Sequence, residues 1–440
     1  MAIIKPFKGY RYNSAKINNF GEVMAPPYDS LSDEQTDSFY DRNPYNAARL
    51  VSQRKLDADD ENNNCYTRSR DFLNSWIEDK ILIREDKPAL YIYEETVTIN
   101  RENYYNRGIV ALLELTDYAD GTVVPCEHPS TNSKNDRFNM ISSTQSNNSL
   151  ISCMYTDRDK VISATLSEIA EGPADMEFTT WNDIKHKLWA VTDEKIIKMI
   201  TEALREKKIF IVDGHNRYEA CLEYKNKQKA ENPDYTGEES YNYVMTLISD
   251  SHDDGRVHLP VHRLVKTKHD IIESYFIAGI QEHFLVEKII VDKLDDDMYE
   301  TMRKQISTQR KETRIAMYTG KNYFFRFTFR DNKYIDMLMP EISESYRYLD
   351  INILNKLILE EQLGIDTDKD DSMIGYTRNI FEGMKAVDNN DFDCMFVMNP
   401  VRPAQLAAMT VSGERLPKRS VSIFPKPATG IVIHKFTPHI

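Results

Sequence analysis

One short stretch, residues 208–220, places an acid, an imidazole and a guanidinium around a single turn. A β-type apolar run ends there and passes directly into a helical pattern, with four candidate residues at the junction: Asp213, Gly214, His215 and Arg217. The first N–H groups of such a helix favour an anion. Asp213 suits a Mg²⁺ ligand or a base, His215 a general acid or base, and Arg217 a fork for phosphate. Taken alone, a plain strand–turn–helix connection with solvated polar groups is the simpler interpretation.

A second set of reactive side chains lies upstream of this turn. Glu127 and His128 form an acid–imidazole pair, and Lys134 and Arg137 follow where a helix is predicted to begin. Such a density of titratable and cationic groups is typical of a catalytic site. A solvated loop followed by a solvated helix face would give the same pattern.

Two proline-containing segments offer further contacts. Consecutive prolines within residues 24–30 enforce an extended backbone, which would present Tyr28 and Asp29 to a cleft. A similar turn at residues 43–49 offers Asn46. The alternative for both segments is an ordinary turn that leads into a helix.

Two later segments carry cations. His262 and Arg263 follow Pro260 in a predicted strand, where they either face the same pocket or serve the packing of the strand. Lys418 and Lys426 flank a short extended stretch near the end of the chain. They either hold anions or protect a sheet edge.

The elements that must position these residues alternate between strands and helices. Period-2 and apolar runs predict strands at 89–93, 108–115, 150–155, 176–180, 187–191, 209–212, 241–248, 257–265, 284–291, 314–318, 323–329 and 394–398. Helical spacing predicts helices over 65–79, 158–170, 216–224, 271–282, 294–309, 350–363, 382–387 and 403–409, and a further helix that starts at residue 192. The pattern changes past Lys266. We therefore predict an α+β (mixed α/β) fold with two domains, residues 1–265 and residues 266–440.

Length, charge and cysteine usage exclude several classes of protein. With 440 residues the chain is too long for one ordinary core. A net charge of −14 argues against a nucleic-acid partner or an anionic membrane surface. The 5 cysteines are scattered without a C-x-x-C pair, which suits a reducing compartment. We find no signal peptide and no apolar run of membrane-spanning length, so a cytoplasmic location is expected.

Several motifs occur in one order along essentially the whole chain, and together they resemble the bacterial domain of unknown function family 1015. They are Met24-Ala-Pro-Pro-Tyr-Asp29, Asn43-Pro-Tyr-Asn46, Glu127-His128 with Lys134-x-Asp-Arg137, Asp213-Gly-His-x-Arg-Tyr-Glu219, Leu259-Pro-x-His-Arg263, and Pro417-Lys-x-Ser420 with Phe424-Pro-Lys426. The D-G-H-x-R element is also similar to the signature of the ParB/sulfiredoxin-like superfamily, which includes ADP-dependent free serine kinases.

This resemblance implies a nucleotide-handling core around residues 213–219, with ADP or ATP and Mg²⁺ as cofactors and a small phosphorylated metabolite as partner. It implies phosphoryl transfer to or from serine. The chain departs from the family pattern at three positions: Cys126 stands where relatives tend to have His, Pro129 where they tend to have Thr, and Arg419 lies inside the Pro417-Lys-x-Ser420 element.

Three hypotheses of function follow. In the first, a phosphotransferase or phosphohydrolase holds phosphate at Arg217 and the helix N-terminus, while Glu127 or His128 activates the acceptor hydroxyl. In the second, a regulator binds a nucleotide or metabolite in the same pocket without turnover. In the third, Cys126 is a nucleophile, which requires a lowered thiol pKa. The sequence leaves the oligomeric state open.

Overall fold

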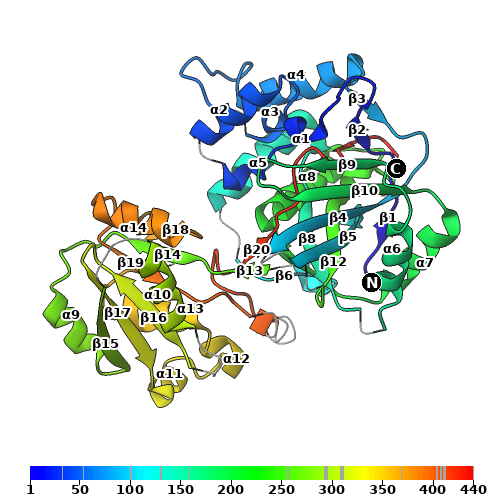
Figure 1. Cartoon of the computed structure of the whole chain (residues 1–440). Helices are drawn as coiled ribbons and strands as arrows, with labels where there is room; N and C mark the ends of the chain where they lie inside the picture. The colour runs from blue at the N-terminus through cyan, green and yellow to red at the C-terminus, as the bar shows by residue number, and fades with distance from the viewer. Residues whose placement is uncertain are drawn as a thin grey trace. The chain divides into compact units, whose positions relative to one another are not determined.

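A computed structural model describes residues 1–440 except 32, 53, 100–101, 129–130, 158, 254, 256, 292–295, 308–311, 368, 403–404, 407–408, 410–412 and 440. The chain forms two compact units (Figure 1). Unit 1 comprises residues 1–125, 129–257 and 423–440, and unit 2 comprises residues 126–128 and 258–422. Residues 126–128 and 258–265 belong to unit 2, although the sequence pattern places them in the first domain. Residues 423–440 belong to unit 1, although the sequence pattern places them in the second domain. Both units combine helices with a sheet, which confirms the predicted α+β class.

Unit 1 is built on a mixed nine-stranded sheet with the order β6-β11-β8-β12-β5-β4-β10-β9, to which β1 adds along β5. Its strands are β1 (Ile4–Lys5), β4 (Leu90–Ile99), β5 (Glu102–Glu114), β6 (Val123–Pro125), β8 (Ile151–Tyr155), β9 (Met176–Thr179), β10 (Lys185–Val191), β11 (Ile209–Asp213) and β12 (Tyr243–Asp250). The hairpin expected between the first two long runs is confirmed, because β4 and β5 pair antiparallel from Tyr91↔Val110 to Ile99↔Glu102.

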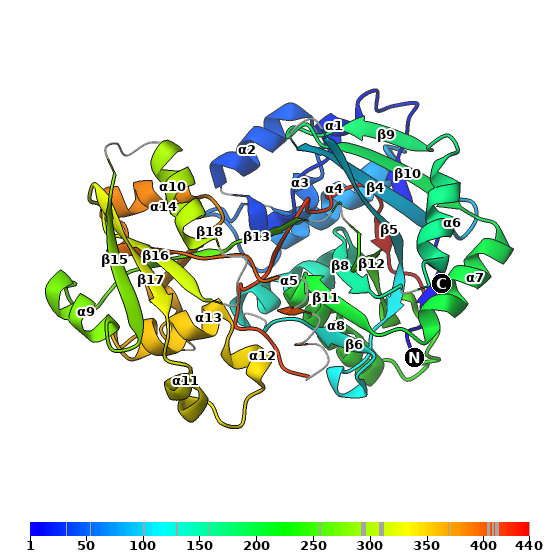
Figure 2. The same ribbon diagram turned by 60° about the horizontal axis from the view of Figure 1, so that its bottom comes forward.

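Both faces of this sheet are buried, because successive side chains of a strand point to opposite sides. Leu90 and Ile92 of β4 pack in one core with residues of α6 (Val161–Ala170), α7 (Glu194–Arg205) and α8 (His215–Glu231). Tyr91 and Tyr93 pack in another core with residues of α1 (Phe20–Val23), α3 (Ala48–Val51) and α4 (Cys65–Glu78). Figures 1 and 2 show these helices around the sheet. The helices of unit 1 are α1 (Phe20–Val23), α2 (Asp33–Arg42), α3 (Ala48–Val51), α4 (Cys65–Glu78), α5 (Thr131–Thr144), α6 (Val161–Ala170), α7 (Glu194–Arg205) and α8 (His215–Glu231).

Smaller pairings complete unit 1. β2 (Tyr10–Tyr12) pairs with β3 (Leu82–Arg84), and β7 (Ser146–Asn147) pairs with β21 (His434–Lys435). The second pairing joins the last residues of the chain to the segment after α5, so a distant piece of sequence becomes part of unit 1. A further two-stranded sheet, which pairs β13 (Val257–Leu259) with β20 (Ser422–Phe424), contains the points at which the chain passes from unit 1 to unit 2 and back.

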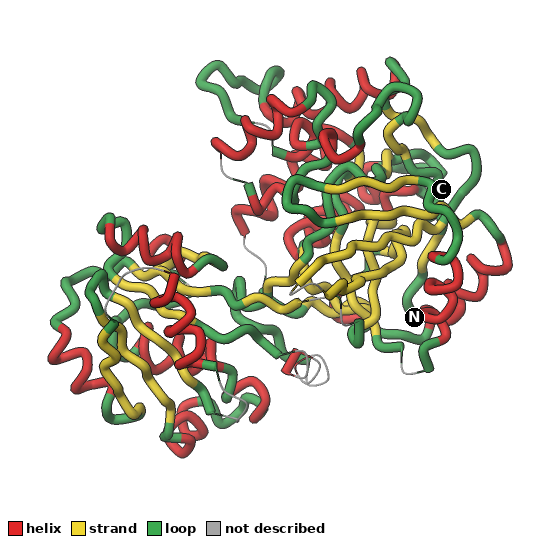
Figure 3. The backbone as a smooth tube through the Cα atoms, in the orientation of Figure 1, coloured by secondary structure: helices red, strands yellow, loops and turns green. Residues whose placement is uncertain are grey.

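Unit 2 contains a six-stranded sheet with the order β15-β17-β16-β19-β14-β18, whose strands and helices are coloured separately in Figure 3. Its strands are β14 (His262–Val265), β15 (Phe284–Ile290), β16 (Arg314–Tyr318), β17 (Tyr323–Phe329), β18 (Ile374–Thr377) and β19 (Cys394–Val397). Its helices are α9 (Glu273–Ile280), α10 (Asp296–Ile306), α11 (Asn332–Leu338), α12 (Glu344–Arg347), α13 (Asp350–Ile353) and α14 (Ile380–Asp388). Side chains of α10 and α14 form a core with β16 and β19.

Two predicted elements differ from the structure. The strand predicted over 257–265 is two strands in different sheets, because Pro260 has no N–H to continue the ladder. The helix predicted over 350–363 is α-helical only to Ile353 and continues as a π-helix over Leu354–Glu360. Most of the helix predicted over 403–409 lies outside the described residues, as does Pro129. Among the helices that the structure describes, none has the length and apolar character needed to cross a bilayer.

Candidate functional site

The strand–turn–helix predicted around residue 213 is present in unit 1. β11 lies between β6, to which it is parallel, and β8, to which it is antiparallel. Gly214 then adopts φ +95° and becomes the N-cap of α8, which has no side-chain cap there. This left-handed conformation favours glycine, and a Cβ at this position would lie 3.0 Å from Nε and Nη2 of Arg217. Gly214 therefore leaves room for the guanidinium beside the turn.

Asp213 is held by two cations. Its Oδ2 lies 2.8 Å from Nη2 of Arg217, and its Oδ1 lies 2.9 Å from Nζ of Lys426. Burial alone would raise the pKa of this carboxyl, but Lys426 and Arg217 outweigh burial and hold it well below its usual range. Asp213 therefore stays ionised, and a carboxylate with so low a pKa is a poor proton acceptor.

Lys426, for which the sequence left open a contact with anions or the protection of a sheet edge, is the central cation of this site. Its side chain is only 9% exposed, and Nζ also lies 2.8 Å from Oδ2 of Asp29. It therefore joins the predicted proline elbow to the β11–α8 turn. The signal in the sequence was the Phe424-Pro-Lys426 motif, but no local pattern indicates that this segment returns to unit 1.

Arg217 lies deeper in the site than its pairing with Asp213 suggests. Its Nη1 donates to the backbone carbonyl of Leu150 over 2.7 Å. Its Nε is shielded from solvent and has no hydrogen-bond partner among the described residues. A buried donor without a partner costs free energy, and an acceptor that enters the site relieves this cost.

A second arginine accompanies Arg217. Arg137 donates from Nε to Asp136 over 3.0 Å and from Nη1 to the carbonyl of Val51 over 3.1 Å. Its Cζ lies 3.7 Å from the centroid of the Tyr28 ring, a cation–π contact. Burial raises the pKa of the Tyr28 hydroxyl, and Arg137 and Arg217 both oppose that rise, so both guanidinium groups lie near this ring.

The two arginines line one small cavity of about 40 Å³. The segment after α5 supplies most of the other polar groups of the lining, which are Ser146, Asn147, Asn148 and Ser149. The remaining lining residues are Val51, Met140, Ile141, Ile151, Cys221 and Val244. One water needs roughly 10–15 Å³, so the cavity has room for a small polyatomic group. Two guanidinium groups with amide and hydroxyl donors suit an oxyanion such as a phosphoryl group.

Two predicted ligand contacts have other roles in the structure. Asn46 is fully buried, and its Nδ2 donates to the carbonyls of Glu22 and Met24 over 2.7 and 2.9 Å. It therefore holds the segment that leads to the proline elbow. Lys134 forms an ion pair of 3.0 Å with Glu223, which connects α5 to α8. His215, by contrast, is buried at the start of α8 beside Asp213.

Glu127 and His128 belong to unit 2, whereas the turn after β11 belongs to unit 1. Oε2 of Glu127 accepts hydrogen bonds from the backbone N–H groups of Ser420 and Val421 over 3.0 and 3.3 Å. Residues 126–128 run beside Leu416, whose N–H donates to the carbonyl of Cys126 over 2.8 Å. Glu127 thus anchors the segment that contains the Pro417-Lys-x-Ser420 element.

His262 and Arg263 also belong to unit 2 and are buried. Burial lowers the pKa of His262 to about 3, and its Nδ1 accepts the N–H of Met398 over 3.0 Å, so the ring is neutral and does not bind phosphate as a cation. Burial lowers the pKa of Arg263 to about 10, so this residue stays charged and donates to the carbonyls of Val261 and Arg419. Arg263 and Lys418 share a pocket of about 20 Å³.

The residues around Asp213 do not fit a bound metal ion, because both carboxylate oxygens already face cations. Nor does any group of three metal-binding side chains occur in the described part of the chain. The 5 cysteines all lie in that part, and each is buried without a disulfide bond. Burial raises the pKa of the Cys221 thiol, in the wall of the cavity, to about 12, so this thiol is unreactive.

Comparisons with known proteins identify a family. The model of a family described as "Protein of unknown function (DUF1015)" matches residues 4–352. A search of the curated proteins finds no match.

Solved structures give remote matches, among them three with identities of 12% or less. A conserved hypothetical protein from Pyrococcus furiosus is 12% identical, with 74% of this chain and 94% of that chain covered and a TM-score of 0.33. A free serine kinase mutant in complex with ADP is 10% identical, with 71% and 87% covered and a TM-score of 0.34. SbnI from Staphylococcus aureus, truncated at its C-terminus, is 9% identical, with 73% and 85% covered and a TM-score of 0.33.

Proposed function

The chain belongs to the DUF1015 family of proteins of unknown function, and we propose that it is a phosphotransferase or phosphohydrolase that acts on a small hydroxylated metabolite. The phosphoryl group lies in the unit 1 cavity beside the β11–α8 turn. The observation that carries this proposal is the pair of buried guanidinium groups, Arg137 and Arg217, that line one cavity, with Arg217 in the first turn of the long helix α8. Guanidinium forks and helix N-termini are both recurrent phosphate-binding devices.

Ion pairs hold the cations at and beside the cavity in fixed positions. Arg137, Arg217 and Lys426 contribute three positive charges, which the carboxylates of Asp29, Asp136 and Asp213 balance. Each cation is thereby fixed in place before a ligand arrives. Phosphoryl transfer depends mainly on such positioning and on neutralising charge at the equatorial oxygens. Asp213 acts as a positioning residue for Arg217 and Lys426, rather than as the base.

The proton and the phosphoryl group need separate partners. In the transferase reaction, the hydroxyl oxygen of the acceptor forms a bond to phosphorus, and the bond between phosphorus and the leaving oxygen of ADP or ATP breaks. His215, which lies next to Asp213 at the start of α8, is our candidate to take the proton of the acceptor. In the hydrolytic version, water replaces the acceptor hydroxyl and phosphate leaves.

L-Serine is the leading acceptor, and phosphoserine is the leading substrate for the hydrolytic version. Serine is small and has one primary hydroxyl. This choice rests on the resemblance of the Asp213-Gly-His-x-Arg217 element to the signature of the superfamily that includes ADP-dependent free serine kinases. Mg²⁺ is expected to enter with the nucleotide, since residues at the site do not form a metal site of their own.

A second candidate function is a nucleotide- or metabolite-binding regulator without turnover. One observation favours it: Asp213, the acid nearest to both Arg217 and the helix N-terminus, is fixed as an ionised partner of two cations. If His215 does not accept a proton, the same cavity binds a phosphoryl group and releases it unchanged.

Two assays distinguish these functions. Purified protein is incubated with Mg²⁺ and L-serine plus ADP or ATP, and separately with phosphoserine alone, and free phosphate, AMP and phosphoserine are measured. Thermal unfolding is followed with and without each nucleotide. Phosphate movement in either assay supports the enzyme. Nucleotide-dependent stabilisation without phosphate movement favours the regulator, and the absence of both effects contradicts a phosphate site.

A further inference from the structure

Unit 2 contains a cavity of about 280 Å³, larger than the phosphate-sized cavity of unit 1. Three segments of unit 2 form its walls: residues 270–276 at the start of α9, the β16–β17 hairpin, and the end of α14 with the loop to β19. Its volume is near the lower end of the range for small-molecule sites, roughly 300–1,000 Å³. All lining residues belong to unit 2.

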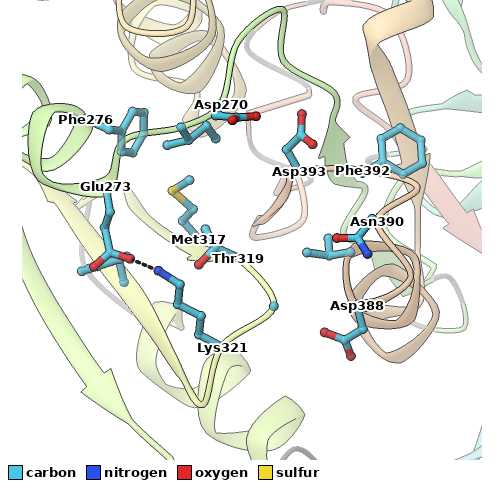
Figure 4. Close-up of a pocket in the computed structure, with 14 residues that line it drawn as sticks. Asp270, Glu273, Phe276, Met317, Thr319, Lys321, Asp388, Asn390, Phe392 and Asp393 are labelled. Carbon is cyan, nitrogen blue, oxygen red and sulfur yellow. Dashed lines mark hydrogen bonds and ion pairs between the residues drawn. The ribbon is translucent and has the colours of Figure 1, made fainter.

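The floor of this cavity is apolar. Phe276, Met317, Phe325 and Val387 line it, and each is less than 9% exposed. Phe392, from the loop between α14 and β19, adds a partly buried ring to the lining (Figure 4). A surface of this kind gains free energy when it covers the apolar part of a ligand.

Carboxylates surround this floor on several sides. Asp270 and Glu273 come from the start of α9, Asp388 from the end of α14, and Asp393 from the loop before β19. Figure 4 shows these four side chains around one open space, with Lys321 on the side of Glu273. Four carboxylates from separate elements therefore face one cavity.

Local cations neutralise only two of the four carboxylates. Glu273 lies 2.8 Å from Nζ of Lys321 and 3.8 Å from Nζ of Lys288, and the hydrogen bond from Lys321 lowers its pKa. Asp393 lies 3.1 Å from Nζ of Lys266. These two acids are therefore already part of the fold's own charge pairs.

The other two carboxylates have no cationic partner among the described residues. Asp388 accepts a hydrogen bond from the hydroxyl of Tyr318 over 2.7 Å, and Asp270 forms no ion pair with a described residue. Both side chains are exposed at the cavity's edge. The hydroxyl oxygen of Thr319, in the wall between them, is shielded from solvent and has no hydrogen-bond partner in the described part of the chain. The cavity thus offers unmatched acceptors above an apolar floor.

We propose that this cavity binds a small organic cation, an amine or guanidinium compound with an apolar or aromatic body. The cationic group pairs with Asp270 or Asp388, and the body covers Phe276 and Phe392, whose rings also attract a cation. A bare divalent cation fits less well, because it requires several converging oxygen ligands, and no group of three metal-binding side chains occurs among the described residues. This site is independent of the phosphotransferase proposal.

Isothermal titration of the full chain with two probes tests the proposal. Phenethylamine combines an ammonium group with one aromatic ring, and agmatine combines an ammonium group with a guanidinium group. Phenylacetate, which has the same ring as phenethylamine but a negative charge, is the matched control ligand. We expect saturable binding of at least one cation, weaker binding at higher NaCl concentration, and no binding of phenylacetate.

Three isosteric variants locate the site. Asp270→Asn and Asp388→Asn each remove one unmatched charge, and we expect each to weaken binding about tenfold. Asp391→Asn changes an exposed neighbour that does not line the cavity, so its affinity should equal that of the wild type. All three side chains are exposed or at the edge, so the unfolding temperature without ligand should not change.

Several outcomes would overturn the proposal. They are the absence of saturable binding by both cations, equal binding of phenylacetate, wild-type affinity in both cavity variants, and complete displacement of the bound cation by millimolar Mg²⁺. None of these outcomes bears on phosphate transfer, because that activity is assayed with serine and nucleotide at the unit 1 cavity.

Discussion

Replacing Lys426 by Met tests whether the end of the chain holds the unit 1 site together. Methionine keeps most of the apolar stem but removes the ammonium group, which lies 2.8 Å from Asp29 and 2.9 Å from Asp213. The two lost pairs differ in worth, because the side chain of Asp29 is 37% exposed and that of Asp213 only 16%. Most of the effect therefore comes from Asp213.

The expected loss follows from burial. Breaking a buried ion pair costs about 3–5 kcal/mol, and the exposed pair with Asp29 adds at most about 1 kcal/mol. Because Arg217 still holds Asp213, we expect Lys426→Met to reduce the free energy of unfolding by about 2–3 kcal/mol in total.

Urea unfolding followed by tryptophan fluorescence measures this loss in the right unit, because the 3 tryptophans, Trp76, Trp181 and Trp189, all belong to unit 1. Lys134→Met is the matched control. Its ion pair with Glu223 is 3.0 Å long, but the two side chains are 29% and 47% exposed, so the loss should stay below about 1 kcal/mol.

Acidity gives a second signature. The pKa of Asp213 lies below its unfolded value, so its stabilising contribution is present above an unfolded pKa of about 3.9 and is lost as the pH falls through the folded pKa. The deficit of Lys426→Met should therefore be full at pH 7 and shrink below about pH 4. In a double-mutant cycle with Asp213→Asn, losses that add within about 0.5 kcal/mol would refute a direct interaction.

Three further perturbations address other parts of the molecule. Arg217→Lys keeps the charge but loses the fork, so the stabilisation of unit 1 by ADP in a thermal shift assay should fall to near zero, and full stabilisation would contradict a phosphate contact. Burial lowers the pKa of His186 to about 3, so the unfolded state takes up a proton at this residue as the pH falls from about 6.5 toward 3, and the folded protein loses up to ~1.4 kcal/mol of stability per pH unit. His186→Gln should therefore flatten the dependence of the free energy of unfolding on pH in this range. An unchanged slope would exclude His186 as a cause of that dependence. Glu127→Ala removes the acceptor of the N–H groups of Ser420 and Val421, which follow Lys418 and Arg419 in the chain. Trypsin should therefore cut after Lys418 and Arg419 several-fold faster in the variant, as mass spectrometry of timed digests would show. Cleavage at the wild-type rate would contradict the anchoring role of Glu127.

Local chemistry explains why the β11–α8 turn could be predicted from the sequence. The apolar run of β11 and the helical spacing of α8 are both local patterns, and Gly214 marks the change of direction with its positive φ. The β4–β5 hairpin follows from the same kind of signal. These strands, this helix and the turn could therefore be predicted from residues that are neighbours in the sequence.

The assembly of the site depends on distant pieces of sequence. Lys426 reaches Asp213 because residues 423–440 return to unit 1, and no pattern around Lys426 indicates its partner. Conversely, Glu127 and His128 lie close in sequence to Arg137 but belong to unit 2. The short distance along the chain suggested a single candidate site, but the structure assigns Glu127 and His128 to unit 2 and Arg137 to unit 1.

Burial also separates residues that look alike in sequence. Asn46 and His262 carry polar groups suited to a ligand, but both direct them to backbone atoms in the interior. The cavity of unit 2 could not be predicted from the sequence, because its four carboxylates come from the separate segments 270–273 and 388–393 and resemble ordinary solvated charges. Only the packed structure shows that they surround an apolar floor.

Phosphorus NMR of the protein with ADP, L-serine and Mg²⁺ tests the central claim most directly, because it detects each phosphorylated species at once. We predict that the ADP signals decline while those of AMP and phosphoserine grow, and that Arg217→Lys slows this change by at least about tenfold. An unchanged spectrum with ADP, with ATP in its place, and with phosphoserine alone would contradict phosphoryl transfer at the unit 1 cavity.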